Sequence, residues 1–350
     1  MKILNKFLIV LMANFLVISV NIAGNEDRVG SAGASQLLIN PWARSTGYGD
    51  ASVANITGIE ASYINVAGLT SIKKSQIKLN HTNWLSSASI GFYSVGYGQK
   101  LDSTSFVGLS IQSMSFGDVN ITSVDNPEGG IGVFSPRSSI INLGYAKLFT
   151  KNVSGGINFK LINESISNLS ATGVAFDAGI KYSMDDQRLK IGITLRNLGP
   201  KMNYSGDGLA TQVTYNSTGK NATLQQRTQP FEMPSLLNMG ASYDFLIDSV
   251  QKLTTMASFT ANSFSNDQYR LGCDYAFNTK NLGFNIRAGY VYEKNLFSSE
   301  LRSNALTGLT SGFSIDFNVG KSTAIGLEYA ARLSSPFGII HTFGTVIAIK

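Results

Sequence analysis

The chain has 350 residues and a formal net charge of +6; only 14% of its residues are charged, whereas 35 are glycines. Soluble domains carry roughly 25% charged residues, and the excess positive charge is too small and too scattered for a nucleic-acid-binding surface. The single cysteine, Cys273, excludes a disulfide framework.

Residues 1–23 have the composition of an export signal. Lys2 and Lys6 precede the apolar run FLIVLMANFLVISV, and the segment ends on the small residue Ala23. The run is short and is interrupted by Asn14, which is typical of a cleaved signal peptide rather than of a membrane span. No later apolar run approaches the length of a membrane-spanning helix, so the sequence excludes a helical membrane protein.

Residues 24–75 are rich in small residues and have no clear alternation of apolar and polar positions. Helical spacing is weakly visible around Ile56, Ile59 and Tyr63. We expect short helices and turns here, forming a hatch that plugs or caps a barrel made by residues 76–350.

The strand pattern is clearest in residues 153–198. In the segment VSGGINFKLINES, Ile157 and Phe159 share one parity, whereas Asn158 and Lys160 take the other, and GVAFDAGIKYS and RLKIGITLRNL repeat this alternation. A period of two indicates strands with one apolar and one polar face. The apolar face continues for about ten residues, long enough for a tilted strand to cross a bilayer, while the polar face carries glycine and charges of both signs, as a barrel lumen would.

Fourteen segments of the chain follow this pattern. They are residues 76–84, 88–100, 106–116, 138–149, 153–165, 173–184, 189–198, 236–246, 252–262, 268–277, 282–292, 309–319, 323–332 and 339–349. An even strand number lets a single-chain bacterial barrel close with both termini on the periplasmic side. The sequence therefore predicts an all-β, 14-stranded antiparallel transmembrane β-barrel in the outer membrane of a diderm bacterium.

The connections between these segments sort by length. The links LDSTS, FTKN, MDDQ, IDSVQK, NTKN and GKS, which follow the even-numbered strands, are all short and polar. The long links are residues 117–137, 199–235 and 293–307, and all of them follow odd-numbered strands. This sorting predicts periplasmic turns at one end of the barrel and extracellular loops at the other.

Charged residues of the polar parity form the candidate lumen set. They are Lys160, Asp177, Lys181, Arg196, Arg270, Asp274, Arg287, Asp316, Glu328 and Arg332. We expect charges of opposite sign on neighbouring strands to pair and to keep the barrel rigid. The alternative is a polar channel wall, whose mixed sign argues against strong ion selectivity.

Residues with catalytic or metal-binding chemistry are few. His81 and His341 share the parity of apolar neighbours, which places both on the lipid side and disfavours catalysis. No cluster of His, Cys or carboxylate residues has ligand spacing, so we expect neither a metal nor a cofactor. In the long loops, Phe134, Phe231 and Met233 are candidate partner contacts, with the equal alternative that they fold into the barrel mouth.

The small-residue segment LLINPWARSTGYGDASVA resembles the PorV/PorQ family of outer-membrane proteins of Bacteroidota, whose pattern is P-x-A-R-x-x-G-x-G-x-A. The residues that carry this resemblance are Pro41, Ala43, Arg44, Gly47, Gly49 and Ala51. A second element, YINVAGL, matches through Asn65, Ala67, Gly68 and Leu69, with Val66 where the family usually has proline. The family is itself similar to FadL-type barrels, which import hydrophobic compounds.

This resemblance implies a 14-stranded barrel with an N-terminal hatch and a role in type IX secretion. Barrels of this kind receive cargo with a C-terminal signal domain from a large translocon barrel and deliver it for surface attachment. The implied partners are outer-membrane lipid, the translocon and the cargo, with no nucleic acid.

Two other functions stay open. A transporter of hydrophobic small molecules would need an apolar pocket beneath the loops, built from residues such as Phe134, Phe231 and Leu237, and a kinked strand. The family also suggests an enzyme that deacylates lipopolysaccharide, which the positions of the two histidines rank last.

Overall fold

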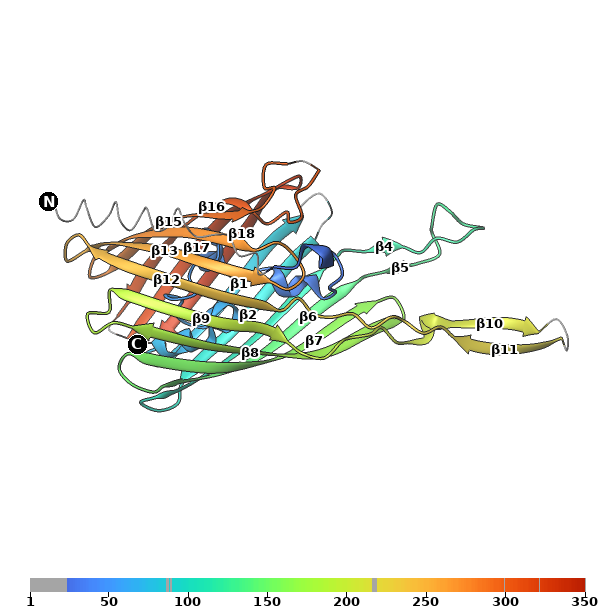
Figure 1. Ribbon diagram of the computed structural model, residues 1–350, viewed down its shortest axis with the longest axis horizontal. Coiled ribbons are helices and arrows are strands. Elements are labelled where there is room, and N and C mark those ends of the chain that lie inside the picture. The colour runs from blue at the N-terminus through green and yellow to red at the C-terminus, as the bar shows by residue number, and fades with distance from the viewer. Residues whose placement is uncertain are drawn as a thin grey trace.

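The computed structural model describes residues 24–85, 88, 90–215, 219–298, 300–320 and 322–349. The predicted signal peptide, residues 1–23, lies outside the described residues. Within them, fourteen antiparallel strands close into a barrel, as predicted (Figure 1). No helix in these ranges is long and apolar enough to cross a membrane.

The barrel strands follow one another around the wall in chain order, and β18 pairs with β1 to close it. They are β1 (Ser75–Leu85), β2 (Ile90–Lys100), β3 (Ser105–Ser115), β6 (Arg137–Leu148), β7 (Val153–Ile166), β8 (Leu169–Ser183), β9 (Leu189–Leu198), β12 (Leu236–Leu246), β13 (Gln251–Asn262), β14 (Gln268–Asn278), β15 (Leu282–Glu293), β16 (Gly308–Val319), β17 (Thr323–Ser334) and β18 (Gly338–Ile349). All fourteen predicted strands are confirmed, and their ends differ from the predicted ends by at most four residues.

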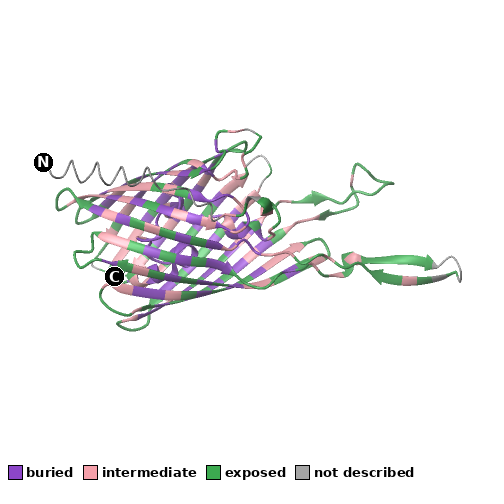
Figure 2. Ribbon diagram, in the orientation of Figure 1, coloured by how far each residue is buried: buried purple, intermediate pink, exposed green. Residues whose placement is uncertain are grey.

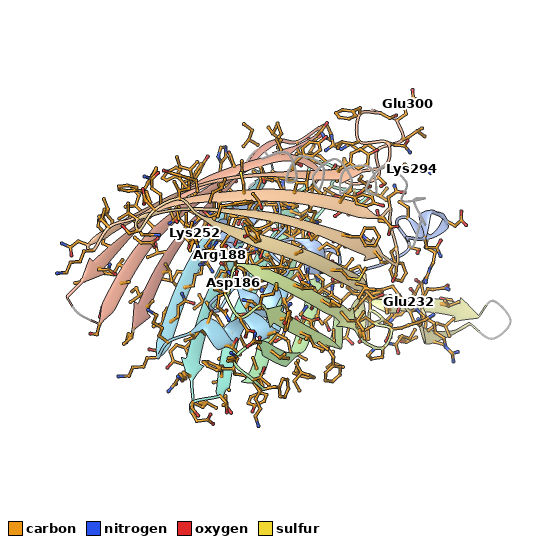
Figure 3. All side chains as sticks on the ribbon, turned by 60° about the vertical axis from the view of Figure 1, so that its left-hand side comes forward. Asp186, Arg188, Glu232, Lys252, Lys294 and Glu300 are labelled. Atoms are coloured by element: carbon orange, nitrogen blue, oxygen red, sulfur yellow. The ribbon has the colours of Figure 1, made fainter. Side chains whose placement is uncertain are left out.

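The wall has polar residues inside and apolar residues outside. In β6, Ile141 and Leu143 are 40% and 56% exposed, whereas Asn142 between them is 2% exposed. The same alternation runs along the other strands (Figure 2). Charged side chains such as Lys252 and Arg188 lie at the short-turn end, and Glu232 lies at the long-loop end (Figure 3). An apolar outer band between polar ends is what a bilayer requires of a barrel.

Two of the long links form β-hairpins that project beyond the rim (Figure 1). The first arm, residues 117–136, contains β4 (Val119–Asn120) and β5 (Val133–Phe134). The second arm, residues 209–226, contains β10 (Ala210–Tyr215) and β11 (Lys220–Gln225) and follows the short 3-10 helix η5 (Asp207–Leu209). The sequence did not predict these strands, because they are short and lie among polar loop residues.

The N-terminal segment lies inside the barrel, where it contacts the strands from several sides (Figure 1). We call residues 24–74 the hatch. Its elements are η1 (Glu26–Arg28), η2 (Ser35–Leu38), α2 (Ala43–Gly47), α3 (Ala61–Ile64) and η3 (Val66–Ser71). Trp42, Ile56 and Leu69 are completely buried in one apolar cluster with residues of the wall. The lumen is thus filled by a small packed core that α2 joins to β15–β17 and η3 joins to β6–β8.

Candidate functional site

The hatch fits the lumen because wall glycines leave room for its backbone. A Cβ atom at Gly192 would lie 2.3 Å from the carbonyl oxygen of Val53, and one at Gly289 would lie 2.3 Å from the carbonyl carbon of Tyr48. Any side chain at these two positions would push the hatch away from the wall. The high glycine content of the sequence therefore has a local explanation in the lumen.

Pro41, Ala43, Arg44, Gly47 and Gly49, which carry the first family motif, lie around helix α2. Pro41, Ala43 and both glycines are buried, and Gly49 has a φ of +67°, which favours glycine. The guanidinium of Arg44 donates hydrogen bonds to the carboxylate of Glu60 and to the carbonyl of Thr57. The motif thus forms a tight turn whose arginine ties two parts of the hatch together.

Asn65, Ala67 and Gly68, which carry the second motif, begin helix η3. The Asn65 amide donates to the carbonyl of Val53 at 2.9 Å and to that of Ile180 in β8 at 3.1 Å, and its oxygen accepts from the backbone N–H of Ala67 at 3.2 Å. A Cβ atom at Gly68 would lie 2.5 Å from a carbonyl oxygen of the hatch. Asn65 therefore caps the helix and joins the hatch to the wall at once.

A buried ion-pair network joins the hatch to the seam between β1 and β17–β18. The Lys78 ammonium lies 3.0 Å from a carboxylate oxygen of Glu60 and 2.7 Å from one of Glu328, and all three side chains are at most 4% exposed. Arg44 adds a second cation to Glu60. Because unpaired buried charges are costly, these contacts fix the hatch in one position.

A second network stands at a bulge in the wall between β8 and β9. The Lys160 ammonium lies 2.7 Å from Asp177 and donates to Asn197 Oδ1 at 2.7 Å. The backbone N–H of Asn197 donates to Asp177 at 2.7 Å, and Asn197 has a φ of +58°. The register shifts here, between Phe176 and Ala178. Polar contacts therefore hold the bulge between β8 and β9 in place.

The other candidate lumen charges have varied partners. Arg287 lies 3.4 Å from Asp274 on the neighbouring strand. Lys181 donates to the carbonyl of Ile56 at 3.4 Å, and Asp316 accepts from Asn285 at 3.1 Å.

Three arginines of the wall lie against the hatch: Arg332, Arg270 and Arg196. Arg332 lies 2.6 Å from Asp50, Arg270 lies 3.9 Å from it, and the Arg196 guanidinium stacks on Tyr63. The sequence analysis missed Asp50, Glu60 and Asn197. Asp50 and Glu60 are acidic residues in a segment of otherwise apolar and small residues. This contrast is the feature of the sequence that could have indicated them.

The candidate loop contacts differ in their surroundings. Met233 is 4% exposed and packs with Leu37 and Ile162 at the mouth of the barrel. Phe231 is half-buried against the same cluster, with its ring 5.7 Å from that of Tyr204. Phe134 lies in the first arm. Leu237 is 37% exposed on the outer face, and it is not among the described residues that line the pocket at the barrel mouth.

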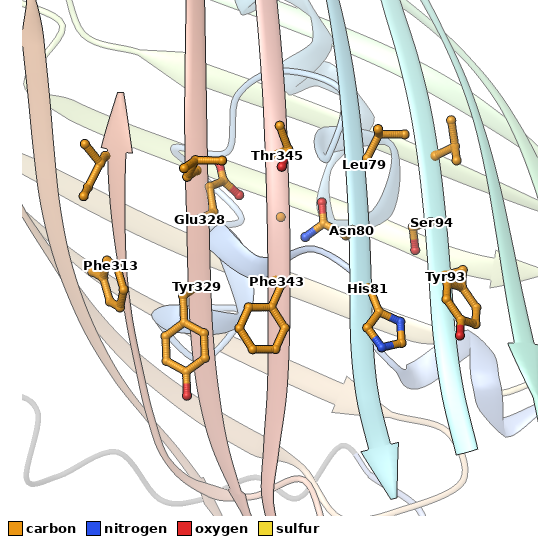
Figure 4. A pocket seen from close by; sticks show the side chains of 14 residues that line it. Leu79, Asn80, His81, Tyr93, Ser94, Phe313, Glu328, Tyr329, Phe343 and Thr345 are labelled. Atoms are coloured by element: carbon orange, nitrogen blue, oxygen red, sulfur yellow. The ribbon is translucent and has the colours of Figure 1, made fainter. Parts of the chain in front are cut away.

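An aromatic row crosses the outer wall on five neighbouring strands (Figure 4). It consists of Phe313, Tyr329, Phe343, His81 and Tyr93, which are successive cross-strand partners. The His81 ring stacks on Tyr93 with centroids 4.6 Å apart, and the His341 ring lies 2.8 Å from the hydroxyl of Tyr329. The row lines a furrow of about 660 Å³ on the lipid-facing surface. Such a band is typical of the membrane interface of a barrel.

Comparison with known proteins gives a family and a fold. The family profile described as "Type IX secretion system protein PorV" matches residues 22–266. No curated protein matches the chain. The Pseudomonas putida toluene transporter TodX is 14% identical with a TM-score of 0.53, covering 87% of this chain and 95% of its own. The Ralstonia pickettii toluene transporter TbuX is 12% identical with a TM-score of 0.54, covering 89% and 97%. A Pseudomonas aeruginosa FadL homologue is 12% identical with a TM-score of 0.50, covering 87% and 96%. At these identities the likeness establishes the FadL-like fold.

Proposed function

The chain belongs to the PorV family of type IX secretion system proteins, and we propose that it is a non-enzymatic outer-membrane adaptor that assists secretion or surface attachment of cargo. Fold and family together imply the outer membrane. In this proposal the arms bind protein partners outside the cell: the translocon barrel and cargo with C-terminal signal domains.

The proposal rests mainly on the structure of the second arm. Within the described residues β10 pairs with β11 alone, so the outer edges of this two-stranded ribbon are free to accept another strand. Val213 and Leu224 are 36% and 46% exposed on it. Free strand edges and exposed apolar side chains beyond the membrane are features of a protein-binding element.

The proposed orientation has the arms outside the cell and both ends of the barrel in the periplasm. Support comes from the distribution of connections, because the short turns and the end of β18 lie opposite the arms (Figure 1). Bacterial barrels have short periplasmic turns and long extracellular loops.

The alternative is transport of a hydrophobic small molecule. It is favoured by an apolar pocket of about 450 Å³ at the mouth, between the hatch and the ends of β1, β2 and β3. The buried ion pairs that hold the hatch argue against it, since a path through the lumen would have to break them. We therefore keep the adaptor as the main proposal.

The test is co-purification from the native outer membrane with and without the second arm. The backbone N–H of Gln226 bonds the carbonyl of Leu209 at 2.9 Å, so residues 210–225 can be replaced by Asn-Gly, which closes a two-residue hairpin on that bond. We expect the shortened protein to fold in normal amounts and to lose a translocon barrel or cargo proteins that the full chain retains. A matched control replaces Val213 and Leu224 by threonine and keeps the ribbon, which separates apolar contact from strand pairing.

If the shortened protein recovered its partners as well as the full chain does, the second arm would not be their binding element. Purification of the intact barrel alone, with a hydrophobic compound bound, would favour transport.

A further inference from the structure

A furrow of about 490 Å³ lies on the outer wall at the loop end of β15, β16, β17 and β18, and we call it the rim furrow. These four strands contribute one side chain each to its wall: Tyr290, Leu309, Leu333 and Ile339. Tyr290 pairs with Leu309 across β15 and β16, and Leu333 pairs with Ile339 across β17 and β18. None of the described residues that line the rim furrow also lines the pocket at the barrel mouth.

The wall of the rim furrow belongs to the lipid-facing side of the barrel. Leu309, Leu333 and Ile339 are 57%, 46% and 49% exposed, whereas the next residue in the chain after each of them faces inward and is at most 4% exposed. These three side chains continue the apolar outer band to the loop ends of their strands. Membrane lipid is therefore the molecule that meets this wall.

The loop between β15 and β16 borders the rim furrow and adds a cation to it. Among the described residues that line the furrow, Arg302 alone is charged. Its Nε donates to the carbonyl of Asn304 at 3.1 Å, and one Nη donates to the carbonyl and hydroxyl oxygens of Thr307 at 2.7 and 3.0 Å. These acceptors are neutral, so they fix the guanidinium without balancing its charge. The second Nη has no hydrogen-bond partner in the described part of the chain.

Two exposed phenylalanines stand beside the rim furrow. Phe297, in the same loop as Arg302, lines it and is 88% exposed. Phe337, in the turn between β17 and β18, is 59% exposed. Glu300, the acid next to Arg302 in this loop, projects away from the barrel (Figure 3). Apolar rings this exposed are unfavourable in water but fit the boundary between lipid head groups and acyl chains.

We propose that the rim furrow binds a phosphate-bearing membrane lipid. The lipid phosphate accepts hydrogen bonds from the Arg302 guanidinium, and an acyl chain lies along Leu309, Leu333 and Ile339. Arginine binds phosphate through charge-assisted hydrogen bonds, and a cation beside an apolar wall matches the two parts of such a lipid. The volume lies in the usual range of small-molecule sites. This inference goes beyond the adaptor function.

Binding can be measured with a fluorophore at position 337, because Phe337 lies between the lining residues Pro336 and Gly338. The full chain with Phe337→Cys and Cys273→Ser is labelled in detergent micelles and titrated with phosphatidylglycerol brominated on its acyl chains. We expect the bromine atoms to quench the fluorophore as the lipid binds. Diacylglycerol with the same brominated chains tests the chains without the phosphate. Inorganic phosphate, as competitor, tests the phosphate without the chains.

The head-group contact is tested by Arg302→Gln, which removes the charge but keeps an amide that can donate to the loop carbonyls. It should weaken phosphatidylglycerol binding by about tenfold or more, the loss expected for a hydrogen bond to a charged group, and leave diacylglycerol binding unchanged. Arg227→Gln, an equal charge change in the link between β9 and β12, is the control and should bind like the unaltered protein.

If Arg302→Gln does not fold, Phe297→Ser tests the same furrow at a side chain that is 88% exposed. It should weaken the binding of both lipids alike, because it shortens the apolar side of the furrow and keeps the cation. Unchanged binding of both lipids by this variant would contradict the proposal.

Equal affinity for phosphatidylglycerol and diacylglycerol, or unchanged phosphatidylglycerol binding by Arg302→Gln, would overturn the phosphate site. Displacement of the lipid by inorganic phosphate at an equal concentration would leave Arg302 a site for a free anion and overturn the lipid site. Absence of quenching would overturn both.

Benzoylphenylalanine in place of Phe297 tests the occupant in the native outer membrane by photo-crosslinking. We expect a lipid adduct, whose mass distinguishes a phospholipid from a lipopolysaccharide, and loss of this adduct when Arg302→Gln is added. A protein adduct instead would make the rim furrow a partner surface and overturn the proposal. The co-purification test of the second arm does not involve Phe297 or Arg302, so the two proposals fail independently.

Discussion

The ammonium of Lys78, in the first strand of the barrel, lies 3.0 Å from the carboxylate of Glu60 in the hatch. Both side chains are at most 2% exposed. Glu328 and Arg44 extend this pair into a network that crosses from wall to hatch to wall. The hatch is therefore joined to the barrel wall by buried ion pairs, and its apolar side chains also fill the lumen.

Replacing Lys78 by methionine should lower the free energy of unfolding by about 3–5 kcal/mol, because it leaves Glu328 buried without its ion-pair partner and leaves Glu60 with Arg44 alone. Urea unfolding in detergent micelles, followed by the heat-dependent gel mobility of the barrel, measures this change. The control is Lys151→Met, whose pair with Asp185 is 82% and 78% exposed and should not contribute measurably. Equal unfolding midpoints for the two variants would contradict the role given to the network.

Gly192→Ala tests the close approach of the hatch to the wall. The added Cβ would meet three backbone atoms of Val53 and Ala54 at 2.3–2.9 Å, so the hatch must move. We expect a loss of about 1–3 kcal/mol in the free energy of unfolding, as for overpacked cores, and faster proteolysis of the hatch. Gly91→Ala is the control, because its nearest neighbour is a flexible Tyr93 side-chain atom at 3.3 Å. A hatch that stays equally protected in both variants would disagree with this packing.

Asn197 combines an uncommon backbone conformation with hydrogen bonds from its backbone and side chain. Its φ is +58°, and its side chain joins Lys160 and the carbonyl of Pro234. Asn197→Gly should lose the side-chain bonds alone, whereas Asn197→Ala should lose about a further 1 kcal/mol for the left-handed backbone. Unfolding midpoints of the two variants give the difference. If alanine proved as stable as glycine, the bulge would not need this conformation.

Glu232 makes the position of the N-terminal segment depend on pH. Hydrogen bonds from Arg28 and Lys201 hold the pKa of Glu232 below its ordinary value of 4.5. Because the pKa is lower in the folded state, the contact stabilises at pH values above 4.5 and is lost as the pH falls through the lower folded pKa. A spin label at Val29, in a protein with Cys273→Ser, should become more mobile over that acid range.

The control for this titration is Glu232→Gln. It removes the charge at every pH, so the label at Val29 should already be mobile at neutral pH and should respond less to acid. An unchanged titration in this variant would assign the transition to another group.

The barrel strands were predictable because each obeys a rule that is local to its own residues. Ile157 and Asn158 are neighbours in the sequence and face opposite sides of the wall, 63% and 0% exposed. The arms were missed for the opposite reason. Hairpins such as β10–β11 have no buried face, so no alternation of apolar and polar residues marks them.

The charges show where prediction from sequence ends. Parity was enough to direct Lys160, Glu328 and Arg332 toward the lumen, but it did not indicate the partner of any of them. Arg332 meets Asp50, 282 residues away, and Glu328 shares Lys78 with Glu60. These partners are set by where the hatch lies within the closed barrel.

The sequence by itself determined the number, order and facing of the fourteen barrel strands, because the lipid and the lumen impose a period of two on every strand that separates them. Only the tertiary structure decided which buried charges pair, which glycines touch the hatch, and that Arg196, Arg270 and Arg332 gather around the hatch. Those features depend on distances between segments far apart in the chain, and they arise only when β18 closes on β1 around the hatch.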